Sequence, residues 1–258
     1  MEYSAKGLRV VVTAGAAGIG RAIARTFVEH GAAVHVCDVD AGALEETAAL
    51  LPGVTQSRAD VSNVADVERL FRDAKQRLGG LDVLVNNAGI AGPTAKVEDI
   101  RPEDWDRCIA VDLNGMFYCT RKAMPMIKAA GGGSIINLSS IAGRFGFPLR
   151  TPYSAAKWAV VGFTQSLAAE AGPQKVRVNC IQPGIVEGDR IDRVVEAKSK
   201  TLGIPREEVK RQMLAGTSLN TTVTAQDIAN MALFLATEPG KHISGQDIAV
   251  CGGSRYLV

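Results

Sequence analysis

The feature that most constrains the fold of this chain is a repeated alternation between short apolar runs and helically patterned segments. Seven runs are predicted to be β-strands, at residues 8–13, 33–37, 54–58, 81–85, 134–138, 176–181 and 248–250. Helical patterns lie at residues 40–51, 62–78, about 102–130 and about 152–171, and Ile19, Ile23, Phe27 and Val28 repeat at helical spacing before Gly31. Crossover helices between parallel strands produce this alternation, and strands covered on both faces have nearly continuous apolar runs. The sequence therefore predicts an α/β fold: a doubly wound, seven-stranded parallel sheet in three α/β/α layers.

Composition and charge narrow the class of protein. The 258 residues are 47% hydrophobic, which is enough for a sizeable core. Twenty-nine basic and 27 acidic residues leave a net charge of +2 without a long run of one sign, which disfavours nucleic acid as a partner. No segment has the pattern of a membrane span or a signal peptide, so we expect a cytoplasmic protein that does not bind membranes. The five scattered cysteines are typical of reduced thiols, and no metal-ligand spacing is present.

One region, residues 186–223, breaks the alternation because it is highly charged and contains no predicted strand. Charge of mixed sign is typical of solvated helices. The segment also leaves the carboxyl end of a strand, where open parallel sheets bind ligands. Both interpretations are compatible. We therefore predict a single domain over residues 1–258 with a helical substrate lid at about residues 187–223.

A glycine-rich turn, residues 13–20, follows the first predicted strand and opens the first helix. Backbone amides and the positive end of the helix would meet a pyrophosphate there. A methyltransferase could share such a turn, and glycine also serves ordinary tight connections. The context favours a dinucleotide site, with contacts from Gly15, Ala17, Gly18, Ile19 and Gly20.

Asp38 ends the second predicted strand and is expected to accept hydrogen bonds from the adenosine ribose hydroxyls. Its charge would repel a 2′-phosphate, and neither the glycine-rich turn nor residues 36–40 offer a basic partner. The sequence therefore predicts NAD rather than NADP as the cofactor. The alternative, that Asp38 caps a helix, is weaker because Asp40 is better placed to do so.

Tyr153 and Lys157 lie four residues apart in a predicted helix, so they share one face. A phenol is a poor base at neutral pH, and a neighbouring ammonium favours its phenolate form. Tyr118 and Lys122 have the same spacing, but Tyr118 lies on an apolar helical stripe, where a packed tyrosine beside a solvated lysine is the ordinary explanation. Tyr153 instead follows Ser140, which stands at the end of a predicted strand.

The order and spacing of these segments resemble the short-chain dehydrogenase/reductase family over essentially the whole chain. The family turn is Thr-Gly-x-x-x-Gly-x-Gly, and Ala14 stands here in place of its first glycine. The other matching segments are Asp60-Val61, Asn86-Asn87-Ala88-Gly89, Ser139-Ser140, the segment from Tyr153 to Lys157, and Pro183-Gly184. The resemblance implies a Rossmann fold and metal-free hydride transfer.

The resemblance also implies roles for individual residues. It places Asp60 and Val61 beside the adenine, and it places Asn87, Ala88 and Gly89 along the path of the cofactor. The nicotinamide carboxamide would be bound by Pro183, Gly184, Ile185 and Val186. Asn86 would brace the sheet. Among catalytic residues, Ser140 would bind the substrate oxygen, Tyr153 would exchange its proton, Lys157 would also hold the nicotinamide ribose, and Asn114 would hold a water linking Lys157 to solvent. For Asn114 the alternative is a helical amide bonded to a neighbouring strand. Gly188 stands where many members carry threonine.

The leading functional hypothesis is an NAD-dependent enzyme that interconverts a secondary alcohol and its ketone. Arg144 and Arg150 precede Tyr153, and an inward-pointing Arg150 would favour a small polar or anionic substrate, although positions on the surface or in a subunit contact are the simpler interpretation for both arginines. A dinucleotide-sensing regulator is the alternative, and a serine hydrolase using Ser140 lacks a nearby histidine. The family resemblance implies a homotetramer.

Overall fold

The computed structural model describes residues 3–257, and its centre is one parallel sheet of seven strands. The strand order is β3-β2-β1-β4-β5-β6-β7, and every neighbouring pair is parallel. The strands are β1 Arg9–Thr13, β2 Ala33–Asp38, β3 Thr55–Arg58, β4 Val83–Asn86, β5 Gly133–Leu138, β6 Val176–Pro183 and β7 Asp247–Val250. This confirms the doubly wound α/β fold, with each strand within two residues of its predicted bounds at either end.

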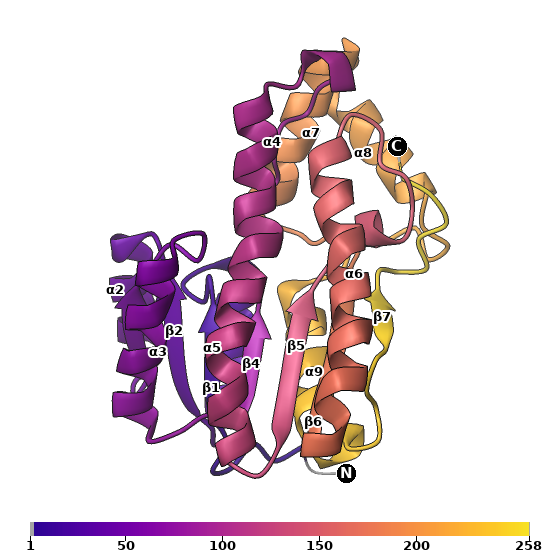
Figure 1. The fold of residues 1–258 in the computed structure, drawn as a ribbon. Helices are drawn as coiled ribbons and strands as arrows, with labels where there is room; N and C mark the ends of the chain where they lie inside the picture. The colour runs from indigo at the N-terminus through magenta and orange to yellow at the C-terminus, as the bar shows by residue number, and fades with distance from the viewer. Residues whose placement is uncertain (1–2, 258) are drawn as a thin grey trace.

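Helices cover both faces of the sheet (Figure 1). Val10 and Val12 of β1 belong to the core formed with the helices of one face, whereas Val11 belongs to the core of the other. The first face carries α1 Gly18–Glu29, α2 Ala41–Leu50 and α9 Ala225–Ala236. The second carries α3 Val64–Leu78, α5 Gly115–Ala129 and α6 Thr151–Ala171. Because side chains alternate along a strand, apolar residues at consecutive positions supply both cores.

The segment predicted as one helix over about residues 102–130 is divided in three. Helix α4 Pro102–Ile109 leads into a π-helical turn, Ala110–Asn114, before α5 begins. Such a turn adds a residue to the helical repeat and redirects the side chains that follow. Apolar spacing alone does not reveal it.

Helix α9 lies outside the sequence-based prediction. Its start is marked by a capping box, in which Thr224 accepts from the backbone N–H of Asp227 and the Asp227 carboxylate accepts from the N–H of Thr224. That four-residue signature was present in the sequence. Short 3-10 turns lie at Val97–Asp99, Ile141–Gly143, Gly172–Gln174 and Glu238–Gly240.

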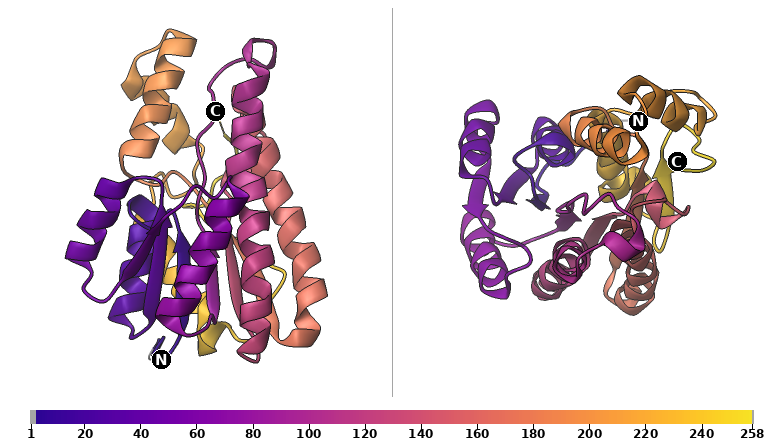
Figure 2. Two further views of the ribbon diagram at one scale, coloured as in Figure 1. Left: turned by 60° about the vertical axis from the view of Figure 1, so that its left-hand side comes forward. Right: turned by 90° about the horizontal axis from the view of Figure 1, so that it is seen from above.

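The charged segment contains two helices, α7 Asp189–Leu202 and α8 Arg206–Ala215. Figure 2 shows them, in orange, beyond the sheet at the end to which the strands point. The segment is closed at its base, because Val223 pairs with Val186 and its N–H donates to Ile185 O at 2.9 Å. The chain therefore leaves the sheet after β6 and returns to the same point before α9.

Among residues 3–257, no helix is long and apolar enough to cross a membrane. The same part of the chain contains no group of three or more His, Cys, Asp or Glu residues arranged to hold a metal ion. All five cysteines are free thiols, and Cys251 alone among them is not fully buried.

Candidate active site

The glycine-rich turn is tightly folded against the sheet. A side chain at Gly20 would overlap the carbonyl oxygen of Ala14, and one at Gly15 would come within 2.8 Å of Val36. Ala14, which replaces the expected glycine, adopts a left-handed conformation with φ of 47°. An alanine tolerates this conformation at a cost of about 1 kcal/mol relative to its usual region, so the turn keeps its shape without that glycine.

The amino end of α1 is open for an anion. Its cap residue, Ala17, makes no side-chain capping hydrogen bond, and the first turn carries no acidic residue. Unpaired amides and the positive end of the helix dipole therefore face outward, where Gly18 removes a side chain from the approach. These features fit the pyrophosphate of a dinucleotide cofactor.

The loop after β4 is fastened to this turn through Thr13. The Thr13 hydroxyl accepts from the N–H groups of Asn87 and Ala88, both at 3.0 Å. The Asn87 amide donates to the carbonyl oxygens of Thr13 and Ala14, also at 3.0 Å. The loop that contains Gly89 is thus held beside the glycine-rich turn, as the resemblance implied.

Asp38 and Asp40, at and just after the end of β2, have different structural roles. The carboxylate of Asp38 accepts from the N–H of Ala16 at 3.3 Å and of Val39 at 2.8 Å, so it is fixed against the glycine-rich turn. Asp40 caps α2 by accepting from the N–H of Ala43. The prediction that Asp40, rather than Asp38, caps the helix is therefore confirmed.

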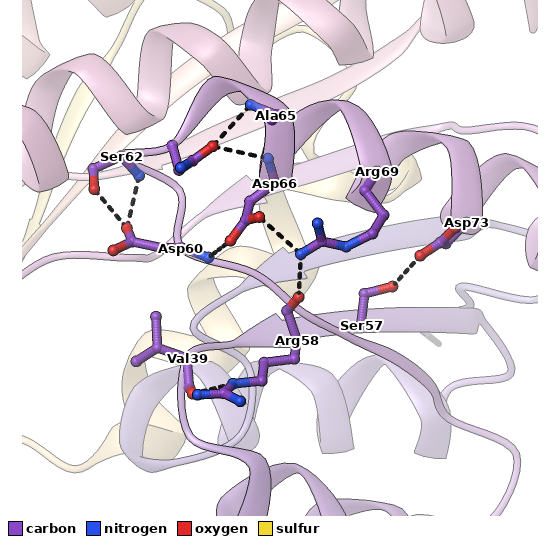
Figure 3. A network of polar contacts seen from close by, with 10 residues as sticks. Val39, Ser57, Arg58, Asp60, Ser62, Ala65, Asp66, Arg69 and Asp73 are labelled. Atoms are coloured by element: carbon purple, nitrogen blue, oxygen red, sulfur yellow. Dashed lines mark hydrogen bonds and ion pairs between the residues drawn. The ribbon is translucent and has the colours of Figure 1, made fainter.

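Beside Asp38 lies a cleft of about 610 Å³, lined by Val39, Arg58, Ala59, Asp60, Asp66 and Arg69. Figure 3 shows its polar network, in which Arg58 donates to Val39 O and the N–H of Asp60 donates to Asp66. Arg58 is paired in register with Asp38 across the sheet, so it is a basic neighbour that the local sequence around Asp38 did not reveal.

Asp60 is anchored on the rim of this cleft. Burial alone would raise its pKa, but hydrogen bonds from Ser62 and the Arg107 guanidinium 3.1 Å away hold the pKa below its ordinary value. The carboxylate is therefore ionised at neutral pH, and its position beside the cleft is compatible with the adenine role implied by the resemblance.

Asn86 braces the sheet below the site. Its buried amide donates to Asn137 on β5 at 2.9 Å and to Thr120 on α5 at 3.0 Å, and Asn137 in turn donates to Thr164 on α6. This buried chain joins two strands to two helices. It fixes the ends of β4 and β5 relative to each other, as predicted for Asn86.

Ser140 follows β5, and Tyr153 and Lys157 lie in the first two turns of α6, which packs against the 3-10 turn that Ser140 begins. Ser140 is 9% exposed and accepts from the N–H of Ala142, while the neighbouring Ser139 donates to the carbonyl oxygen of Lys157 at 2.7 Å. The Lys157 ammonium donates to Leu138 O at 3.0 Å and lies 5.6 Å from the centre of the Tyr153 ring. The helical spacing thus places a buried cation beside a half-buried phenol.

Two arginines add to the positive charge around Tyr153. The guanidinium carbon of Arg150 lies 5.3 Å and that of Arg190 5.7 Å from the centre of the ring. Arg150 is only 2% exposed, and burial lowers the pKa of its guanidinium. Within residues 3–257, neither arginine forms an ion pair with a carboxylate. Arg150 therefore lies inside the molecule, and the surface position suggested as the simpler interpretation is wrong for it.

Arg150 and Arg190 are held by neutral acceptors. Arg150 donates to the carbonyl oxygen of Ala91 and to Thr94, while its Nε has no hydrogen-bond partner in the described structure. Arg190, an exposed residue of α7, donates to Gly89 O at 3.3 Å. Within the described residues, neither charge is therefore paired with a carboxylate.

The structure does not bring Asn114 to Lys157. Asn114 is exposed, whereas Asp112 is fully buried with Oδ2 3.4 Å from the Lys157 ammonium. Asp112 and Asn114 are two residues apart in the π-helical turn, so their side chains face nearly opposite ways. Within residues 3–257 it is thus Asp112 that contacts Lys157, and the water-holding role implied for Asn114 stays a prediction.

The second Tyr-Lys pair is structural. Tyr118 packs partly buried against one of the two main cores, and Lys122 forms an exposed ion pair with Glu68 at 2.7 Å. The interpretation of this pair as a packed tyrosine beside a solvated lysine is confirmed.

A serine, a histidine and an aspartate also meet at β3, but not as a hydrolytic triad. Ser57 lies between His35, at 3.1 Å, and Asp73, to which it donates at 3.1 Å. The other nitrogen of His35 is bonded to Thr55, and burial lowers the pKa of His35 to about 4. A triad needs the histidine between the other two residues, so this buried group serves the fold.

After β6 the chain turns sharply toward α7. Gly184 packs so closely on Cys251 that a side chain there would come within 2.6 Å of its Cα. Gly188 has φ of 122° and ψ of −179°, a conformation essentially restricted to glycine. The threonine that many family members carry at this position would therefore not fit the backbone. Ile185 and Val186 lie between Gly184 and Gly188, whose conformations are both constrained.

Comparison with known proteins agrees with this geometry. The family model described as Enoyl-(Acyl carrier protein) reductase matches residues 14–255. A D-beta-hydroxybutyrate dehydrogenase of Rhizobium meliloti is 35% identical over 250 residues, which cover 94% of this chain and 96% of the relative. A sorbitol dehydrogenase of Cereibacter sphaeroides is 36% identical over 250 residues, which cover 96% and 97%. The crystal structure of levodione reductase matches with a TM-score of 0.91 at 26% identity, over 96% of this chain and 97% of that one.

The chain belongs to the short-chain dehydrogenase/reductase family. It is an oxidoreductase that acts on CH–OH groups with a nicotinamide cofactor, the activity common to the named relatives. The comparisons give no support to a dinucleotide-sensing regulator.

Proposed function

We propose that this enzyme transfers hydride between NAD and a small secondary alcohol or its ketone, and that the substrate carries an anionic group. The observation that carries the proposal is the surroundings of Tyr153, whose ring has Lys157, Arg150 and Arg190 within 6 Å of its centre. These positive charges surround a phenol at the start of α6, which makes Tyr153 the candidate general base.

Tyr153, Ser140 and Lys157 have separate roles in the proposed reaction. A bound nicotinamide supplies the hydride acceptor for alcohol oxidation and the hydride donor for ketone reduction. Tyr153 takes the hydroxyl proton of the alcohol, and Ser140 orients the same oxygen by a hydrogen bond. Lys157 places a positive charge 5.6 Å from the centre of the Tyr153 ring, and its ammonium donates to Leu138 O.

Replacing Tyr153 by phenylalanine tests the base. Loss of a positioned proton acceptor lowers turnover by about 10²–10⁴-fold, so we expect Tyr153→Phe to lose at least a hundredfold in kcat while its affinity for NAD changes less than threefold. Absorbance at 340 nm measures turnover, and calorimetry measures NAD binding. Tyr118→Phe is the matched control and keeps its activity. Full turnover by Tyr153→Phe would refute the assignment.

The preference for NAD is supported by the carboxylate of Asp38 beside the glycine-rich turn. A 2′-phosphate there would meet a fixed negative charge. Arg58, on the neighbouring strand, donates to Val39 O at 3.1 Å and is the basic group that a 2′-phosphate would meet if that carboxylate were absent.

Asp38→Ser should therefore shift the preference toward NADP. We expect the ratio of kcat/KM for NADP to that for NAD to rise at least a hundredfold, because one repulsive charge is removed while Arg58 remains. Steady-state kinetics with both cofactors measures the ratio. The double variant with Arg58→Gln should recover little of the NADP activity, and a ratio that stays unchanged in Asp38→Ser contradicts the ribose role of Asp38.

An anionic substrate is supported by the two arginines. Each guanidinium is held by neutral acceptors, and a carboxylate in front of Tyr153 would supply the missing counter-charge. The dehydrogenase of Rhizobium meliloti is named for hydroxybutyrate, an anion, whereas sorbitol, the substrate named for the other relative, is neutral. The charges at Arg150 and Arg190 favour the first of these two classes.

We also propose that residues 187–223 act as a lid over the substrate. Arg190 belongs to α7 and touches Gly89 at the site, while the base of the segment is tied by the Val186–Val223 bridge. The segment is also tied near its end, because Thr217 forms a bridge with Ser254 and the N–H of Leu219 donates to Gly252 O. Helices α7 and α8 are therefore the part that would close over a ligand.

Paired substrates test both the anion and the lid. Arg190→Gln should lower kcat/KM for 3-hydroxybutyrate at least tenfold and for its uncharged methyl ester less than threefold, because only the acid gains the charge-assisted contact. Arg193→Gln, an exposed change on the same helix, is the control. Equal losses for the two substrates would rule out anion binding by Arg190 and remove its support for a lid.

We also propose that the protein is a homotetramer, and exposed aromatic residues on the outer helices support contacts between its copies. Phe117 on α5 is 48% exposed and Trp158 on α6 is 51% exposed. Large apolar side chains on adjoining helices are typical of contacts between copies of a chain. Light scattering on the purified protein should give four times the 27.2 kDa chain mass, and a monomeric mass would contradict the assembly.

A further inference from the structure

Asp112 and Lys157 form an ion pair in the interior of the protein. Their side chains are 0% and 4% exposed, and Asp112 Oδ2 lies 3.4 Å from the ammonium. Asp112 comes from the π-helical turn between α4 and α5, whereas Lys157 comes from the second turn of α6. The pair therefore connects two helical segments directly below the Tyr153 ring.

The two oxygens of Asp112 have separate partners. Oδ1 accepts from the N–H of Ile90 at 2.7 Å, which fastens the loop after β4. Oδ2 has no hydrogen-bond partner within the described residues, and its ion pair is with Lys157. A buried carboxylate is unfavourable unless a cation balances it.

The space around the pair leaves little freedom. A side chain at Gly89 would come within 3.2 Å of the Lys157 ammonium and 3.3 Å of Asp112 Oδ2. The only other titratable side chain in this part of α4 is Cys108, whose pKa burial raises to about 11. The thiol is neutral at physiological pH, so Asp112 is the one negative group among three cations, Lys157, Arg150 and Arg190.

We infer that Asp112 is a positioning residue for Lys157: its carboxylate holds the ammonium below Tyr153 and offsets part of the positive charge that acts on the phenol. Without it, Lys157 would be buried with a single backbone acceptor, Leu138 O. The catalytic part of this inference rests on the proposed role of Tyr153 as the base.

A double-mutant cycle in urea tests the ion pair without any measurement of activity. Lys157→Met leaves the buried carboxylate without its counter-charge, and adding Asp112→Asn removes that charge. At pH 8, we therefore expect the double variant to unfold at a higher urea concentration than Lys157→Met alone. If the losses of stability toward urea in the two single variants simply add in the double variant, the ion pair is not the role of Asp112.

The pH dependence of turnover tests the effect on Tyr153. The groups that face the phenol are Lys157 and Arg150 from α6 and its approach, and Arg190 from α7. Asp112→Asn removes the negative charge among them, so the acidic limb of kcat/KM for alcohol oxidation should move to lower pH by about one unit. Asp106→Asn, an exposed change on α4, should leave the limb in place.

The outcomes separate the two claims. If the acidic limb of Asp112→Asn stays in place while the urea cycle shows coupling, Asp112 has a structural role only and the tuning of Tyr153 is wrong. If Tyr153→Phe retains full turnover, the proposed base is wrong, yet the urea cycle still decides whether Asp112 and Lys157 form a pair. If the urea cycle shows coupling between Asp112 and Lys157 and the acidic limb of Asp112→Asn also moves, both parts of the inference are supported.

Discussion

The parallel register of β1, β4, β5 and β6 is the constraint on which the site depends. It brings the carboxyl ends of these strands to one edge, where each is followed by a functional segment. The buried amides of Asn86 and Asn137 keep β4 and β5 in this register, and the Thr13 hydroxyl ties β1 to the loop after β4. Groups far apart in the chain therefore meet, as when Arg190 donates to the carbonyl oxygen of Gly89 at 3.3 Å.

Charge then gives the site its chemical character. The sheet edge collects three cations around one phenol, and a single buried carboxylate lies among them. In water the electrostatic interactions of these groups would be weak and screened by salt. Burial of Lys157 and Arg150 strengthens the interactions that each of them makes. The proposed role of Tyr153 as the base and the proposed binding of an anionic substrate both depend on this positive charge.

Local patterns predicted most of the fold and the core of the site. The seven strands, the glycine-rich turn and the Tyr153 and Lys157 pair each depend on short-range spacing that the sequence displays directly. Features that depend on contacts between distant elements were missed. Arg58 on β3 lies in register with Asp38 on β2, and Arg150 is buried. The π-helical turn was also missed, because the apolar pattern over residues 102–130 is compatible with one continuous helix. Helix α9 was missed although its capping box was present.

The bridge between Val186 and Val223 has a consequence for how such enzymes diversify. Residues 187–223 leave the sheet after β6 and rejoin it at this bridge, and a second bridge joins Thr217 to Ser254 near the end of the chain. Because α7 and α8 lie outside the sheet between these ties, their length and sequence can change without displacing a strand. Relatives of similar length that are named for hydroxybutyrate and for sorbitol illustrate how different substrates are served by one scaffold.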